Sequence, residues 1–178
     1  MLSPELDIDT TIVSFILFVM IAFFIRPPIK IILFALIGGV AFAMLNNVSD
    51  IVGYWANWWR FPFLSDRYPP LAFYLPALFF YGAGMAGLIG WWLRQKFGSR
   101  SAIIFLPLVA VFVGLVRPIV EWIVKSGTIM AVKNDFVPYL ALYLDCLLLS
   151  SVAYLVVLGL ERIAQSKSLV VNRHDLAV

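Results

Sequence analysis

Three ionisable side chains interrupt two of the most apolar stretches of this 178-residue chain. Arg117 and Glu121 are four residues apart, so a helix would carry them on one face, one turn apart. Asp145 interrupts the next apolar stretch. A charge inside a membrane-spanning helix is costly, and such residues usually face protein or water and pair with one another. The spacing therefore predicts an intramembrane cluster of one cation and two carboxylates.

The two apolar stretches are expected to be helices that cross the membrane, so the depths of Arg117 and Asp145 can be compared by counting residues from the outer ends of these helices. At a rise of about 1.5 Å per residue, Arg117 and Asp145 each lie roughly 12 Å below the outer surface. Two chemistries remain open. An ion-pair network would fix the register of the helices, with Arg117 bidentate to a carboxylate. Alternatively, Glu121 or Asp145 is a catalytic acid or part of a proton or anion site, with the hydroxyl of Tyr143 nearby.

Other site chemistry finds no support in the residues. The chain has one histidine, His174, near its C-terminus, and one cysteine, Cys146, within an apolar stretch. We therefore expect no metal site, no haem and no other cofactor. The string from Gly82 to Gly87 matches G-x-G-x-x-G, but the dinucleotide-binding motif needs a preceding strand, and here the string lies in an apolar helix.

The composition identifies the class of protein. Hydrophobic residues make up 63% of the chain and charged residues 13%, whereas soluble domains have roughly 45–50% and 25%. A helix needs about 20 mostly apolar residues to cross the hydrocarbon core. The predicted fold class is an all-α integral membrane protein, a bundle of five transmembrane helices in a single domain over residues 1–165. A cytoplasmic tail follows over residues 166–178, and it should be unstructured unless a partner holds it. The five spans are expected at residues 10–25, 29–45, 70–93, 101–124 and 137–160.

The ends of these spans give an orientation and a connection. Arg26-Pro27-Pro28 should end the first span, which either pairs with the second as a tight hairpin or crosses obliquely. With the N-terminus outside, the inner segments hold eight Lys and Arg residues and the outer ones four. This asymmetry predicts an N-terminus outside and a C-terminus in the cytoplasm, in the cell (inner) membrane. The net charge of +3 then needs no nucleic-acid partner.

The first outer loop is rich in tryptophan. Trp55, Trp58 and Trp59 are spaced i, i+3 and i+4 and are followed by Arg60. A helix would place the three indoles on one face, and tryptophan prefers the headgroup level of a bilayer. The pattern predicts an interfacial helix on the outer leaflet, which can also serve as a lid or a docking surface.

Small residues form a stripe along the third span. Helices in a membrane approach closely where small residues recur every four positions, so this stripe predicts a packing face, with Gly38-Gly39 of the second span as its complement. The stripe consists of Gly82, Ala83, Ala86, Gly87 and Gly90.

These observations leave three functions open. The first is a non-enzymatic subunit of a larger membrane complex, whose partners are the lipid bilayer and other membrane subunits or further copies of the chain. The second is a membrane enzyme acting on a lipid or isoprenoid, with Glu121 or Asp145 as the acid. The third, a small transporter, ranks last because the polar residues cluster only in the outer half of the spans.

Overall fold

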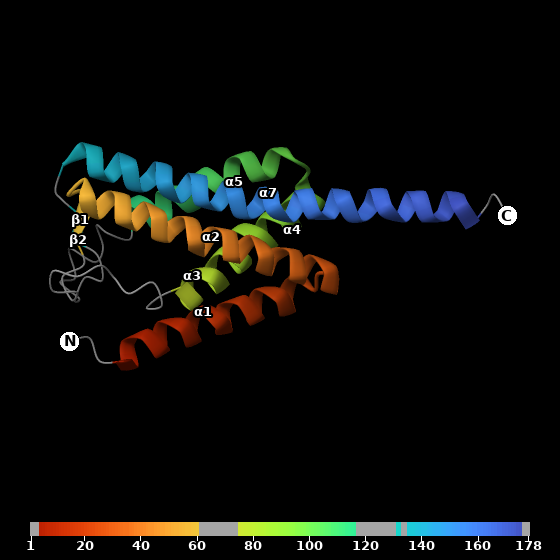
Figure 1. The fold of residues 1–178 in the computed structure, drawn as a ribbon, viewed down its shortest axis with the longest axis horizontal. Helices are drawn as coiled ribbons and strands as arrows, with labels where there is room; N and C mark the ends of the chain where they lie inside the picture. Colours follow the sequence, from red (N-terminus) through yellow and green to blue (C-terminus); the bar gives the residue numbers. More distant parts are fainter. Residues whose placement is uncertain (1–3, 61–74, 117–130, 133–134, 176–178) are drawn as a thin grey trace.

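The computed structural model describes the backbone of residues 4–60, 75–116, 131–132 and 135–175, and side chains within 11–59, 76–114 and 135–166. Helices dominate the described residues, and the predicted helical bundle is confirmed (Figure 1). The segments Ile29–Trp55, Pro76–Phe97 and Phe136–Ser166 are long and apolar enough to cross a membrane, while Thr11–Ile25 and Arg100–Gly114 are shorter apolar helices. The elements are α1 (Pro4–Ile25), α2 (Ile29–Trp55), β1 (Trp59–Arg60), α3 (Leu75–Tyr81), η1 (Gly82–Ile89), α4 (Gly90–Phe97), α5 (Arg100–Val111), η2 (Phe112–Val116), β2 (Ala131–Val132) and α7 (Phe136–Asp175), where η1 and η2 are π-helical.

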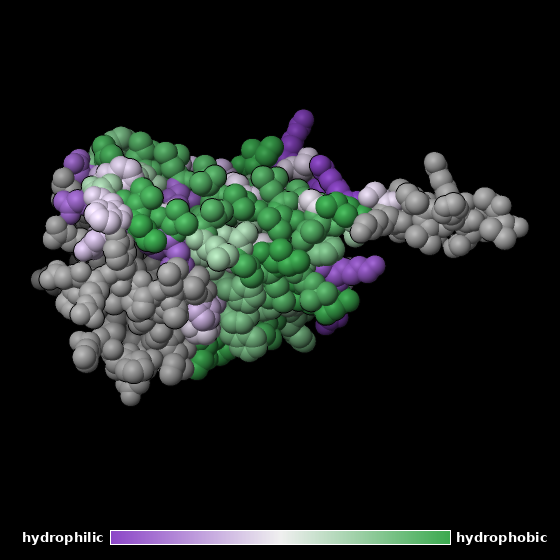
Figure 2. Space-filling model, in the orientation of Figure 1, coloured by the Kyte–Doolittle hydropathy of each residue, from purple (hydrophilic) through white to green (hydrophobic). Residues whose placement is uncertain are grey.

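The outside of the bundle is apolar between its two ends. Figure 2 shows a wide hydrophobic band across the body, with hydrophilic residues mainly toward the ends. Large side chains such as Phe15, Leu33, Ile103 and Leu148 are about half exposed or more. A soluble monomer rarely exposes so much contiguous apolar surface, and this surface suits a lipid environment.

The connection between α1 and α2 follows the sequence prediction. α1 ends at Ile25, Arg26 adopts a left-handed conformation (φ 49°), and α2 begins after Pro28. The two helices do not form a tight hairpin, because α1 diverges from α2 and packs against α3 and η1 (Figure 1). Phe15 and Phe18 of α1 both contact the ring of Phe80, with centroid distances of 5.1 and 5.8 Å.

The second span was predicted to end at residue 45, but α2 continues to Trp55. The two asparagines that were expected to end the helix satisfy their amides within it. Asn47 Nδ2 donates to the carbonyl oxygen of Ala43 at 3.0 Å, and Asn46 Nδ2 donates to Asp50 Oδ2 at 2.7 Å. Their side chains therefore support the helix rather than compete with it.

The predicted Trp-rich interfacial helix is wrong. Trp55 is the last residue of α2, and Asn57 has a left-handed backbone (φ 55°). The N–H of Asn57 donates to the Tyr54 carbonyl at 3.0 Å, and the N–H of Trp58 donates to the Gly53 carbonyl at 2.9 Å. This pair of bonds is the Schellman motif that terminates many helices. Because the chain reverses there, the three indoles cannot share one helical face.

Beyond this turn, β1 pairs with β2 in an antiparallel two-stranded ladder, with Trp59 opposite Val132 and Arg60 opposite Ala131. The ladder joins the two loops at this end of the bundle. At the other end, α7 continues as a helix to Asp175, whereas the sequence predicted a tail that is unstructured unless a partner holds it. The 40 residues of α7 extend over roughly 60 Å.

The middle of the bundle is the glycine-rich helix formed by α3, η1 and α4. η1 packs against α1, α2 and α7, so small residues are needed on several sides of it rather than along one stripe. Gly82 lies against Phe42 and Gly87 against Ala35, both on α2. Gly84 faces Ile21 of α1, and Gly90 faces Tyr154 of α7.

The other members of the predicted packing face are also buried. Ala83 lies against Gly39 of α2, and Ala86 belongs to a core cluster with Phe42, Leu149 and Ala153. The absence of side chains at the glycines leaves room for the neighbouring helices to approach closely.

The contact of α2 with α7 at Gly38 gives a test of this packing. A Cβ at Gly38 would lie 2.7 Å from the carbonyl oxygen of Ala153, whereas a Cβ at Gly159 of α7 would meet nothing within 4 Å. We expect Gly38→Ala to lower the free energy of unfolding by about 1–3 kcal/mol, as overpacking does. Gly159→Ala, the matched control, should be neutral or stabilising. Unfolding in detergent followed by circular dichroism measures both, and equal stability of the two variants would contradict the packing.

Candidate functional site

The polar contact between α2 and α7 contains the one predicted intramembrane carboxylate that the structure describes. Asp145 lies on α7 and is partly buried. Ser49 Oγ on α2 donates a short hydrogen bond of 2.5 Å to Asp145 Oδ1. Since α2 packs along α7, this bond joins two long helices at one level.

A second carboxylate lies next to this contact. Asp50 follows Ser49 in α2 and is 7% exposed, and one of its oxygens accepts the bond from Asn46. With the buried Asn47, α2 carries four polar residues within five positions. Sequence reasoning missed this group because it placed these residues in the outer loop. The i, i+4 spacing of Asn46 and Asp50 was the signal that they belong to a helix.

Trp59 packs next to this contact, against the end of α2 and the start of α7. Its ring is 3% exposed and lies so close to the backbone of Gly53 that no other residue type fits there. It forms a cluster with Leu142 of α7, against which Cys146 also packs. Trp59 Nε1 is buried and has no hydrogen-bond partner among the described residues. By contrast, Trp55 is 74% exposed, and Trp58 is only partly buried.

The structure describes only some of the other predicted site residues. Arg117 and Glu121 lie outside the described residues, so the network of three charges remains a prediction. Gly114, three positions before Arg117, packs against the backbone of Tyr143, two positions before Asp145. Tyr143 itself is partly buried on α7, and the side chain of Arg60 lies outside the described residues.

A second polar cluster at the opposite end of the bundle was not predicted. Glu161 of α7 accepts hydrogen bonds from three side chains of α4: Trp91 Nε1 at 3.1 Å, Arg94 Nη1 at 3.2 Å and Gln95 Nε2 at 3.3 Å. Arg94 and Glu161 also form an ion pair. The three donors are spaced i, i+3 and i+4, so they share one face of α4, which was the available signal.

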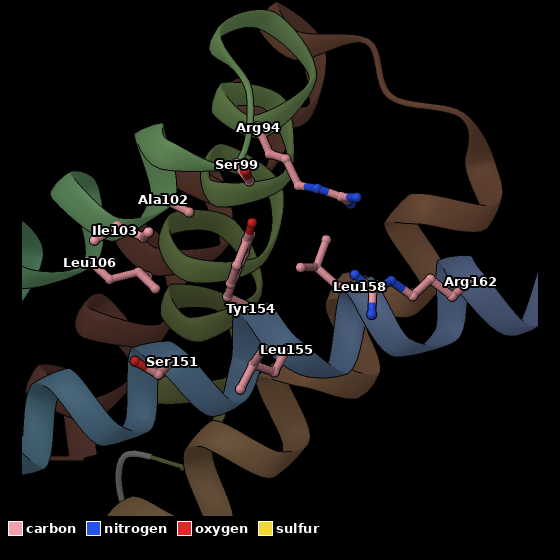
Figure 3. A pocket seen from close by; sticks show the side chains of 10 residues that line it. All are labelled: Arg94, Ser99, Ala102, Ile103, Leu106, Ser151, Tyr154, Leu155, Leu158 and Arg162. Atoms are coloured by element: carbon pink, nitrogen blue, oxygen red, sulfur yellow. The ribbon is translucent and has the colours of Figure 1, made fainter.

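The chemistry of both clusters follows from these contacts. The three carboxylates of these clusters, Asp50, Asp145 and Glu161, each accept a hydrogen bond from a side chain, and the last two are bound by a neighbouring helix. Such bonds hold helices in register. Within the described residues, no group of three or more His, Cys, Asp and Glu side chains is placed to hold a metal ion. A cavity lined wholly by described residues lies elsewhere, between α4, α5 and α7 (Figure 3).

Comparison with protein-family models, curated proteins and solved structures found no match for this chain.

A double-mutant cycle tests whether Ser49 and Asp145 couple the two helices. Ser49→Ala removes the donor from a partly buried carboxylate, which should cost about 1–3 kcal/mol of unfolding free energy. Adding Ser49→Ala to Asp145→Leu should cost much less than Ser49→Ala alone, giving a coupling of at least about 0.5 kcal/mol. Ser151→Ala is the control, since its hydroxyl donates to the Leu147 carbonyl of its own helix at 2.6 Å. Additive effects of the two substitutions would show that the contact does not couple α2 to α7.

Proposed function

We propose that the protein is a five-span integral membrane protein of the cell (inner) membrane and a non-enzymatic subunit of a larger membrane assembly. Its N-terminus is outside, and its C-terminus is in the cytoplasm. The long apolar helices, the two shorter ones and the apolar outer surface support the spans.

The arrangement of the basic residues supports the orientation. The turn between α1 and α2, the connection from α4 to α5 and the C-terminal part of α7 lie toward the same end of the bundle (Figure 1). Most of the Lys and Arg residues belong to these segments, and cytoplasmic segments are enriched in them. They are Arg26, Lys30, Arg94, Lys96, Arg100, Arg162, Lys167 and Arg173.

The observation that carries the proposal is the extension of α7. The helix continues 14 residues past Glu161, from residue 161 to residue 175, and stands clear of the bundle (Figure 1). This extension is roughly 21 Å long. An isolated helix shorter than about 12–15 residues is marginal in water, so contact with another subunit would stabilise this one. A projecting helix is a suitable element for docking outside the membrane.

The carboxylates support a structural role over a catalytic one. The acid required by an enzyme that acts on lipid would be Glu121 or Asp145. Asp145 accepts a bond from Ser49 between two packed helices, as expected for a group that sets helix register. A membrane enzyme and a transporter remain the alternative functions. Purification of the protein with or without partner subunits distinguishes these alternatives from a role as a subunit.

The test is purification of N-terminally tagged chain from its native membranes in mild detergent. We expect partners in fixed stoichiometry with the full chain. They should be depleted at least about tenfold, equivalent to 1.4 kcal/mol, when residues 167–178 are replaced by a Gly/Ser segment of equal length. The replaced chain should keep the elution volume of the folded bundle. Isolation of the full chain as a monodisperse monomer would contradict the proposal. Lipid turnover by that monomer, lost in Asp145→Asn, would favour the enzyme.

A further inference from the structure

A groove of about 530 Å³ lies between α4, α5 and α7 and is separate from the Ser49–Asp145 contact. Its walls are mainly apolar, with Ile103 and Leu106 from α5 and Leu155 and Leu158 from α7. Ile103 is 71% exposed and Leu155 is 60% exposed, so the groove opens on the apolar outer face of the bundle rather than into its core.

One end of the groove is polar and basic. Arg94 comes from α4, Ser99 from the start of α5 and Arg162 from α7, and all three line the groove. Figure 3 shows the hydroxyl of the buried Tyr154 pointing toward the end that Arg94 and Ser99 form. Two arginines and one glutamate, Glu161, leave a net charge of +1 here. Glu161 accepts from Nη1 of Arg94, and no described residue accepts from the other guanidinium donors of Arg94.

The length of the groove matches one leaflet of a bilayer. Its lining on α7 runs from Ser151 to Arg162, eleven helical steps apart. This is roughly 16 Å along the helix axis, and half of the hydrocarbon core is about 15 Å. With Arg162 at the headgroup level, Ser151 lies near the middle of the membrane.

We propose that this groove binds one anionic phospholipid of the inner leaflet. Its phosphate binds between Arg94 and Arg162, and one acyl chain lies along Ile103, Leu106 and Leu155. Guanidinium groups bind phosphate oxygens through paired, charge-assisted hydrogen bonds, and the cytoplasmic leaflet is the usual location of anionic lipids. The proposal rests on the membrane insertion proposed above but not on assembly with other subunits, since one chain forms the whole groove.

The experiment is native mass spectrometry of the purified chain in mild detergent. The chain is titrated with phosphatidylglycerol or with phosphatidylcholine of identical acyl chains. We expect one phosphatidylglycerol to be retained in preference to phosphatidylcholine. Arg162→Gln should lower this preference about fivefold, the effect of one interfacial cation. Soluble glycerol phosphate should not compete, because it has no acyl chain to fill the apolar part.

Two further variants keep the test decisive. Lys30→Gln removes an exposed cation from the same end of the bundle but outside the groove, and it should keep the preference. Leu155→Trp fills the apolar part without changing the charge, so it should weaken retention of both lipids, and it replaces Arg162→Gln if that variant does not fold. Equal retention of the two lipids, an equal loss in Lys30→Gln, competition by glycerol phosphate, or unchanged retention in Leu155→Trp would each overturn the proposal.

Discussion

The hydrocarbon core of a membrane contains no water, so every polar group that a protein places there must be satisfied by the protein itself. Three described polar side chains of α2 and α7 illustrate two ways of following this rule. Asn47 and Ser151 bond to carbonyl oxygens of their own helices and leave the helix surface apolar. Ser49 instead bonds to Asp145 on another helix, which ties α2 to α7. Because a carboxylate also needs a partner within the protein, its hydrogen bond restricts how the helices around it can pack.

Helices in lipid gain little from hiding apolar surface, so their contacts depend on close packing. The glycine-rich η1 supplies that packing on several sides, because α1, α2 and α7 all approach its backbone. Gly38 plays the same part where α2 meets α7. The Ser49–Asp145 bond and the Gly38–Ala153 contact both lie along the interface between α2 and α7. The groove arises at the end of the bundle where α4 and α5 connect and α7 passes beside them (Figure 3).

The sequence predicts those features of the fold that depend on composition and local backbone chemistry. Apolar length gave the helices, and Arg26-Pro27-Pro28 gave the first turn. The end of α2 was predicted wrongly. An asparagine amide can end a helix by bonding to nearby backbone groups, or it can bond to residues within the helix, and the sequence does not distinguish the two. An asparagine such as Asn57 favours the left-handed residue of a Schellman turn. The regular spacing of the tryptophans favoured a helix over the same residues, and that prediction was wrong. Contacts between distant residues, such as those of Glu161 with α4, depend on tertiary packing, which the spacing of one helix does not encode.

The central claim is that the apolar band of the bundle lies in a bilayer with its basic end in the cytoplasm. Cysteine labelling tests it directly, because Cys146 is the one cysteine in the sequence and Cys146→Ser leaves a background without thiols. Into this background we would introduce Ala56→Cys after α2, Leu148→Cys on the apolar face of α7, or Ser166→Cys at the basic end. A membrane-impermeant maleimide should label Ala56→Cys in intact cells, Ser166→Cys only after lysis, and Leu148→Cys in neither case, although Leu148 is 58% exposed. Labelling of Leu148→Cys in intact cells, or of Ser166→Cys before lysis, would contradict the account.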